Sequence, residues 1–128
     1  MKKTLLIFFL VLSISGFAQF SKTHYIPPLT CANNLAGDQY LYISTPSTAN
    51  VKFKIIANGV TIYDNVVSNN SPNVYPIGQG ANTQLITPKN ATGILTNKGY
   101  IIEAEDLVYV SVRLNSSHNG NGTYNHAG

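Results

Sequence analysis

Three acidic residues, Glu103, Glu105 and Asp106, come closest in type and spacing to a catalytic or metal site. Glu103 and Glu105 are two residues apart, so on a β-strand both would point to the same face. Paired carboxylates carry out acid–base chemistry in glycosidases, and together with Asp106 and backbone carbonyls they would suit Ca²⁺. Acids that flank a turn of a sheet are more often solvated. The chain is therefore predicted not to be an enzyme, with calcium binding as a secondary alternative.

Histidine and cysteine add little chemistry. His118 and His126 lie in one Asn- and Gly-rich segment, whereas a metal site needs three or four converging ligands. Cys31 is the only cysteine, so an intrachain disulfide is excluded. A buried thiol and a pairing with a cysteine outside this sequence both stay open. Nucleophile-elbow, zinc-protease and P-loop motifs do not occur in the sequence, and no cofactor is expected.

Tyrosine is a more informative residue type, because the chain has eight tyrosines and no tryptophan. Tyr40, Tyr42, Tyr63 and Tyr109 all fall in segments that alternate like β-strands. If these rings form an exposed, coplanar row, they would stack on sugars and favour a carbohydrate-binding module. If they are buried or scattered, recognition of another kind of macromolecule is favoured.

The strands that must position these side chains follow from apolar alternation. Residues 39–45 and 51–57 alternate between apolar and polar side chains, which predicts two half-buried strands. Asn58 and Gly59 then separate the second run from residues 60–67, which alternate as well. Asn-Gly between two such runs is the strongest short-range signal for a β-hairpin, because a type I′ turn needs φ > 0 at both central residues.

The second half of the chain continues the β pattern. Residues 74–77 are predicted to form an edge strand, because Pro76 cannot donate to a ladder. Residues 107–114 alternate strongly, and the acidic trio is expected to mark the turn in front of them. Short strands with turn signals about every 8–12 residues predict an all-β fold, an antiparallel immunoglobulin-like or jelly-roll-like β-sandwich. This domain would occupy residues 39–114, after an extended segment at residues 19–38.

Residues 1–18 (MKKTLLIFFLVLSISGFA) have the pattern of a cleaved signal peptide. Lys2 and Lys3 precede an apolar run, and Gly16 and Ala18 place small residues before the cleavage site. The run is too short for a transmembrane anchor. After cleavage, no stable membrane span is expected, and the protein is predicted to be secreted or held at the cell surface.

The charge of the exported chain argues against nucleic acid as a partner. Loss of the two signal lysines leaves six basic against five acidic residues, so the exported chain is nearly neutral. Lys52 and Lys54, on one face of a predicted strand, are the nearest approach to a basic patch. A nucleic-acid interface needs a concentrated basic face, and none is predicted.

The last segment, residues 115–128 (NSSHNGNGTYNHAG), is predicted to be a loop and the point at which a longer protein is truncated. The sandwich is therefore expected to be incomplete at its C-terminus. An exposed apolar patch or an unpaired strand edge is expected near residues 107–114.

Residues 24–28 (HYIPP), 98–112 (KGYIIEAEDLVYVSV) and 115–128 also carry a family resemblance. The segment 24–128 resembles the start of large secreted proteins of Bacteroidetes that carry a β domain like the N-terminal domain of IgGFc-binding protein. Such proteins often end in a type IX, gliding-motility-associated sorting domain, and this chain would be the N-terminal part of one. The resemblance transfers no catalytic residues.

These observations together lead to one expected function and one alternative. The expected function is that of a non-catalytic, exported binding or adhesion module within a larger surface or secreted protein. Its partners would be an extracellular protein or glycan and other domains of the same polypeptide. The alternative is a carbohydrate-binding module of a secreted enzyme.

Overall fold

A computed structural model describes residues 20–30, 36–88, 91–116 and 124–127, and these residues form strands and their connections. The strands are β1 (Ser21–Ile26), β2 (Leu29–Thr30), β3 (Ala36–Ser44), β4 (Val51–Ala57), β5 (Val60–Val67), β6 (Asn73–Gln79), β7 (Ile86–Thr87), β8 (Tyr100–Ser116) and β9 (Tyr124–Ala127). The described part of the chain contains no helix. The predicted all-β class is confirmed. Within that part, no helix is long and apolar enough to cross a membrane.

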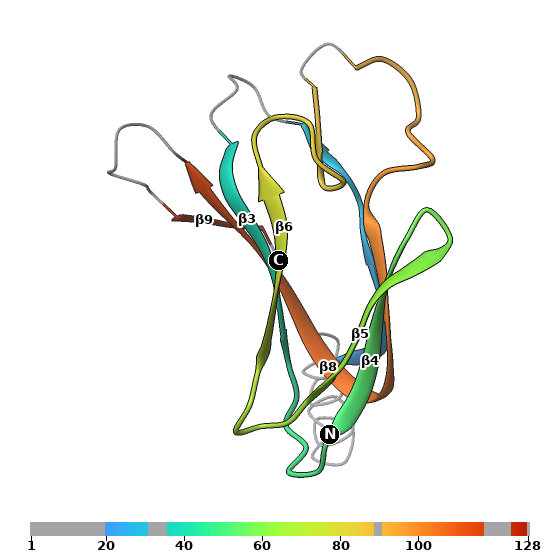
Figure 1. Cartoon of the computed structure of the whole chain (residues 1–128), viewed down its shortest axis with the longest axis vertical. Helices are drawn as coiled ribbons and strands as arrows, with labels where there is room; N and C mark the ends of the chain where they lie inside the picture. The colour runs from blue at the N-terminus through green and yellow to red at the C-terminus, as the bar shows by residue number, and fades with distance from the viewer. Residues whose placement is uncertain (1–19, 31–35, 89–90, 117–123, 128) are drawn as a thin grey trace, which may run out of the picture.

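Seven of the strands form one antiparallel sheet that curls into two facing layers (Figure 1). The strand order is β5-β4-β8-β3-β6, and β1 and β9 also pair with β8. Strands β2 and β7 form a separate parallel pair, in which Leu29 lies beside Ile86. This arrangement is sandwich-like, with the small parallel pair as its one departure from antiparallel pairing among the described strands.

Strand β8 joins the two layers. Its first part, residues 100–104, lies between β1 and β4, and its second part, residues 109–116, pairs with β3. Figure 1 shows β8 descending in one layer, bending at the lower end of the molecule and rising in the other. The predicted turn at the acidic trio is therefore wrong, because these residues lie inside a continuous strand.

The bend explains why a polar, acidic segment occurs within a strand. Glu105, Asp106 and Leu107 are exposed on its outside, while Val108 is fully buried on its inside. The bend is held by its neighbours, since the Thr45 hydroxyl donates to the Leu107 carbonyl at 2.7 Å. The acidic residues therefore lie on the solvent side of a bend at which the strand backbone keeps a hydrogen bond to its neighbour.

The core lies between the two layers and follows the predicted alternation. Leu41 and Ile43 of β3 are fully buried, as is Ile55 of β4. The other buried apolar side chains are Val51, Phe53, Val67, Leu85, Ile86, Tyr100, Ile102, Val108, Val110 and Val112. Burying an aliphatic side chain of this size contributes about 1.5–3 kcal/mol each, so this cluster is the main stabilising feature of the fold.

The β4–β5 hairpin is confirmed with its predicted turn. Asn58 and Gly59 have φ of 50° and 75°, the positive values that a type I′ turn requires. The ladder starts regularly, with Ala57 beside Val60, but shifts between Ile55 and Ile56. The hairpin therefore contains a bulge that the sequence pattern does not predict.

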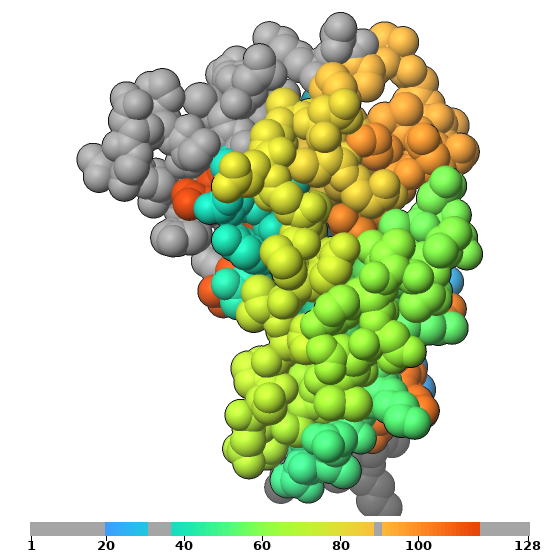
Figure 2. Space-filling model, viewed as in Figure 1, coloured from blue at the N-terminus to red at the C-terminus, as the bar shows by residue number. Residues whose placement is uncertain are grey.

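Strand β6 confirms the predicted edge strand with Pro76, because it ends the sheet order. Figure 2 shows β5 and β6 meeting along the front of the molecule, green against yellow. An isolated bridge between Ser68 and Ser71 ties their near ends. The two ends of the curled sheet thus lie next to each other without forming a continuous ladder in the described residues.

The structure differs from three predictions about the ends of the domain. The extended segment at residues 19–38 contributes β1, so the sheet begins before residue 39. The predicted loop at residues 115–128 is wrong where β8 continues to Ser116 and where β9 pairs with it. The expected apolar patch near residues 107–114 is wrong, because the inward valines of this stretch are buried. Residues 112–114 pair with both β3 and β9, whereas residues 109–111 have β3 as their only partner strand among the described residues, so this part of the edge is unpaired as expected.

Candidate functional site

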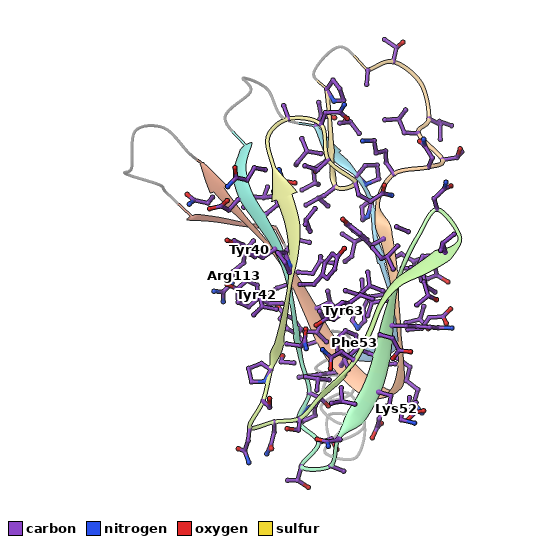
Figure 3. The ribbon with its side chains drawn as sticks, viewed as in Figure 1. Tyr40, Tyr42, Lys52, Phe53, Tyr63 and Arg113 are labelled. Carbon is purple, nitrogen blue, oxygen red and sulfur yellow. The ribbon has the colours of Figure 1, made fainter. Side chains whose placement is uncertain are left out.

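The outer face of β3 and the second part of β8 gathers three of the four candidate tyrosines. Tyr40 is the cross-strand partner of Arg113, and Ser44 is the partner of Tyr109. Directly opposite residues share a face, so Tyr40, Tyr42, Tyr109 and Arg113 all point away from the core. We call these four residues the aromatic outer face. Figure 3 shows Tyr40, Tyr42 and Arg113 projecting from this side of the molecule.

The aromatic outer face is held by contacts among its own side chains. The Arg113 guanidinium carbon lies 4.1 Å from the centre of the Tyr42 ring, a cation–π contact typically contributing about 0.5–1 kcal/mol at an exposed site. Tyr40 and Tyr42 have ring centres 6.2 Å apart at 71° to each other. Phe20 packs on Tyr109 with centres 6.1 Å apart. The side chains are half-buried, and the Tyr40 and Tyr42 rings are not coplanar.

Tyr63, the fourth candidate, lies inside the fold instead. A regular two-residue hairpin would place Ile62 opposite Ile55, but the bulge makes Tyr63 the partner of Ile55. Because a shift of one residue exchanges the two faces of a strand, Tyr63 turns inward and Ile62 becomes 43% exposed. Figure 3 shows Tyr63 and Phe53 between the layers.

The inward tyrosine belongs to an internal aromatic cluster. Tyr63 lies 5.1 Å from Tyr75 between ring centres, and Tyr75 lies 6.2 Å from Tyr100. The Asn65 side-chain amide donates to the Tyr63 hydroxyl at 2.7 Å. Burial raises the pKa of Tyr100 well above its ordinary value, and neighbouring Tyr75 raises this pKa further. The cluster fills the space between the β5 and β6 ends of the sheet.

The acidic candidates lie on the opposite outer face, on β8 where it pairs with β4. Glu103 forms an ion pair with Lys54 at 2.9 Å, with both side chains nearly half exposed. The Asp106 carboxylate accepts a hydrogen bond from the Leu107 backbone N–H at 2.8 Å. Within the described residues, no three acidic, histidine or cysteine side chains converge as a metal site would require. The structure therefore does not bring Glu103, Glu105 and Asp106 together around one point.

Two shallow hollows indent this second outer face. One, of about 380 Å³, is lined by Lys52, Phe53, Lys54, Asp64, Glu103, Ala104 and Glu105. The other, of about 500 Å³, lies by the hairpin turn, and Tyr25, Ile56, Lys98 and Ile101 are among its lining residues. Tyr25 is 74% exposed and was not a sequence candidate. Residues 21–26 (SKTHYI) do not alternate between apolar and polar side chains, so the sequence carried no signal for an exposed Tyr25.

Cys31 and His118 lie outside the described residues, as does the predicted signal peptide at residues 1–18. His126 is in β9, where its backbone is the register partner of Arg113.

Comparisons with known proteins return no match, whether with protein-family models, curated proteins or solved structures. The features of the molecule that bear on function are the two outer faces and the chemistry of their side chains.

Proposed function

We propose that this chain is a non-catalytic binding module that contacts an extracellular macromolecule through the aromatic outer face. The observation that carries the proposal is the grouping of Tyr40, Tyr42 and Tyr109 with Arg113 on one side of the sheet. Tyrosine and arginine are, with tryptophan, the residue types most enriched among the residues that dominate affinity at protein interfaces. Strands hold them rigidly, which lowers the entropy lost on binding.

A protein partner is favoured over a sugar by the geometry of the rings. Stacking on a sugar chain uses flat rings that lie in one plane, whereas Tyr40 and Tyr42 are inclined by 71°. The two inclined rings and the guanidinium above Tyr42 make this surface uneven. An uneven surface suits the irregular surface of a protein better than the flat face of a sugar. The carbohydrate-binding module of a secreted enzyme is the second candidate function, supported by the number of aromatic rings on this face.

The remaining parts of the proposal rest on the sequence. The charge and apolar pattern of residues 1–18 supports export and a secreted or cell-surface location. The resemblance to Bacteroidetes surface proteins supports a place within a larger, type IX-secreted polypeptide, whose other domains would be partners. A non-catalytic role is supported by the Lys54–Glu103 ion pair. The Glu103 carboxylate is one of the two that glycosidase-like acid–base chemistry would require, and here it is bound to a lysine.

The proposal is tested by measuring binding of the exported protein to an array of extracellular proteins and an array of glycans. We expect binding to a protein, weakened at least tenfold by Tyr42→Ala and by Arg113→Ala. Arg113→Lys should restore little, because a lysine lacks the planar group that stacks on the ring.

The matched control is Thr92→Ala, exposed in the connection between β7 and β8, which should leave affinity unchanged. Binding to glycans that is lost in the same two variants would favour the carbohydrate-binding alternative. Binding that neither variant weakens, or an exported protein that binds neither array, would contradict the proposal. N-terminal sequencing of the exported protein tests the signal peptide, and a retained Met1 in secreted material would contradict cleavage.

A further inference from the structure

The outer face formed by β5, β4, the first part of β8 and β1 carries its side chains in rows across the strands. Its middle row runs Asp64, Lys54, Glu103 and Thr23, each the cross-strand partner of the next. Directly opposite residues share a face, and the Lys54–Glu103 ion pair at 2.9 Å confirms this for the centre of the row. We call this surface the charged outer face.

Two further rows flank the middle one. Toward the hairpin turn, successive partners are Thr61, Ile56, Ile101 and Tyr25. On the other side, Lys52 is the partner of Val66, and Lys52 and Glu105 line the same hollow. The face is therefore apolar near the hairpin turn, where Tyr25 is 74% exposed, and charged further away.

The two central strands of this face are complementary to each other. Strand β4 supplies the lysines and one isoleucine, and β8 supplies the glutamates and a second isoleucine at the matching heights. A two-fold rotation about an axis parallel to the strands, midway between β4 and β8, exchanges these two columns. The face is thus complementary in charge and in apolar character to its own rotated image.

We propose that a second copy of this chain docks on the charged outer face, with the two sheets face to face around this axis. Lys54 of one copy then lies opposite Glu103 of the second copy, and Ile56 lies opposite Ile101. The Lys54–Glu103 pair of each copy becomes part of a group of four charges with alternating signs. Asp64 lies opposite Thr23 and therefore meets no like charge. Sheets that pack in this way keep their strands within about 30° of each other.

The size of the face indicates a weak dimer. Four strands about 4.8 Å apart, each contributing five residues at about 3.4 Å, outline roughly 330 Å² per copy. Twice this area is below the ~1,200 Å² at which stable interfaces begin, in the range of weak or transient pairs. Association should accordingly appear as a concentration-dependent equilibrium.

Charge exchange tests the complementarity. The protein recovered from an exporting host is studied by sedimentation velocity over a dilution series, with circular dichroism as the check on folding. One variant reverses the lysines, Lys52→Glu with Lys54→Glu, and another reverses the acids, Glu103→Lys with Glu105→Lys. Each alone should be monomeric at concentrations where the parent dimerises. Mixed in equal amounts, the two should associate at least tenfold more tightly than the parent. In the mixed dimer the facing and the diagonal charge pairs are all attractive, whereas in the parent the diagonal pairs, such as Lys54 with Lys54 of the second copy, repel each other.

The matched control carries all four reversals in one chain and retains each ion pair within and between copies. It should dimerise like the parent, and it also tests the proposal if a double variant fails to fold. A parent that stays monomeric throughout, a mixture that does not associate, or a fourfold variant that is monomeric would each overturn the proposal.

Cross-linking tests the axis. Asp64 and Thr23 lie on the outermost strands, about 14 Å apart in one copy, but face each other across sheets about 10 Å apart. In a Cys31→Ser background, a mixture of Asp64→Cys and Thr23→Cys proteins should give cross-linked dimers with a short bismaleimide. Either variant alone should not, because its two symmetry-related cysteines would be about 17 Å apart. Equal cross-linking of one variant with itself would overturn the two-fold arrangement.

Discussion

The β4–β5 hairpin and strand β8 have equally regular alternating sequences, but different forces shape them. The hairpin turns where Asn58 and Gly59 adopt positive φ, so its course is set by the residues of the turn. Strand β8 passes through an acidic segment that looks like a turn, because β1, β4 and β3 hydrogen-bond to it on both sides of the bend. Local turn chemistry decides a strand's course only where no distant strand competes for its backbone.

The largest effect should come from removing core volume in β8. Ile102 is fully buried between β1 and β4, so Ile102→Ala should reduce the free energy of unfolding by about 3 kcal/mol through lost burial and a residual cavity. Urea denaturation measures the change. The control is Ile62→Ala in the hairpin, where the side chain is 43% exposed, and the loss should stay below ~1 kcal/mol. Equal losses would contradict the central role of β8.

A glycine comparison sharpens the contrast between distant and local constraints. Gly99 has φ of 88°, and a Cβ there would collide with the backbone carbonyl oxygen of Ile26. Gly99→Ala should therefore cost about 2–3 kcal/mol, from backbone strain and displacement of the β1 end. Gly59→Ala should cost only about 1 kcal/mol, because a Cβ at Gly59 meets no atom within 4 Å. Similar losses in thermal unfolding would show that the contact with Ile26 relaxes freely.

The start of β8 should also respond to alkaline pH. The folded state keeps the Tyr100 proton because burial raises its pKa, whereas the unfolded chain releases it near the ordinary value of 10.0. Above that pH the folded state binds more protons than the unfolded state, so stability is lost as pH rises. Replacing Tyr100 by Phe should reduce this loss by about 1 kcal/mol per pH unit above 10.

The alkaline experiment compares denaturant midpoints below and above pH 10 for the parent and for Tyr100→Phe. Tyr25→Phe, on an exposed side chain, is the control and should follow the parent curve. An alkaline slope that is identical in Tyr100→Phe would contradict the assignment to this residue.

The smallest effect should come from the hairpin turn itself. Gly59→Val should cost about 1 kcal/mol, because a β-branched side chain resists φ of 75°. Gly59→Asn is the control and should be close to neutral, since asparagine tolerates positive φ. An unchanged melting temperature in Gly59→Val would mean that the turn adopts another type in solution.

Much of the fold was open to prediction from local pattern. The buried alternation in residues 39–45 and 51–57, the Asn58-Gly59 turn and the edge strand with Pro76 are all present. Each depends on interactions within a few residues or on whether one side of a strand is apolar. Such features leave a direct trace in the order of residue types.

The candidate sites were less predictable, for a physical reason that Tyr63 illustrates. One bulge in the hairpin exchanges the faces of β5, so Tyr63 enters the core while Tyr40, Tyr42 and Tyr109 stay outside. The side chains of residues 60–67 are compatible with either register, because both alternating sets include apolar residues. In the structure Tyr63 points inward, where it packs against Tyr75 and Phe53.

By itself, the sequence determined the all-β class, the position of the hairpin and the sides of β3 and β4 that face the core, because backbone sterics and apolar periodicity act over short distances. Tertiary structure alone decided that β8 is one bent strand, that β1 and β9 join the sheet, and which residues meet on each outer face. Those outcomes depend on pairing between segments far apart in the chain, and local residue patterns do not specify which strands pair.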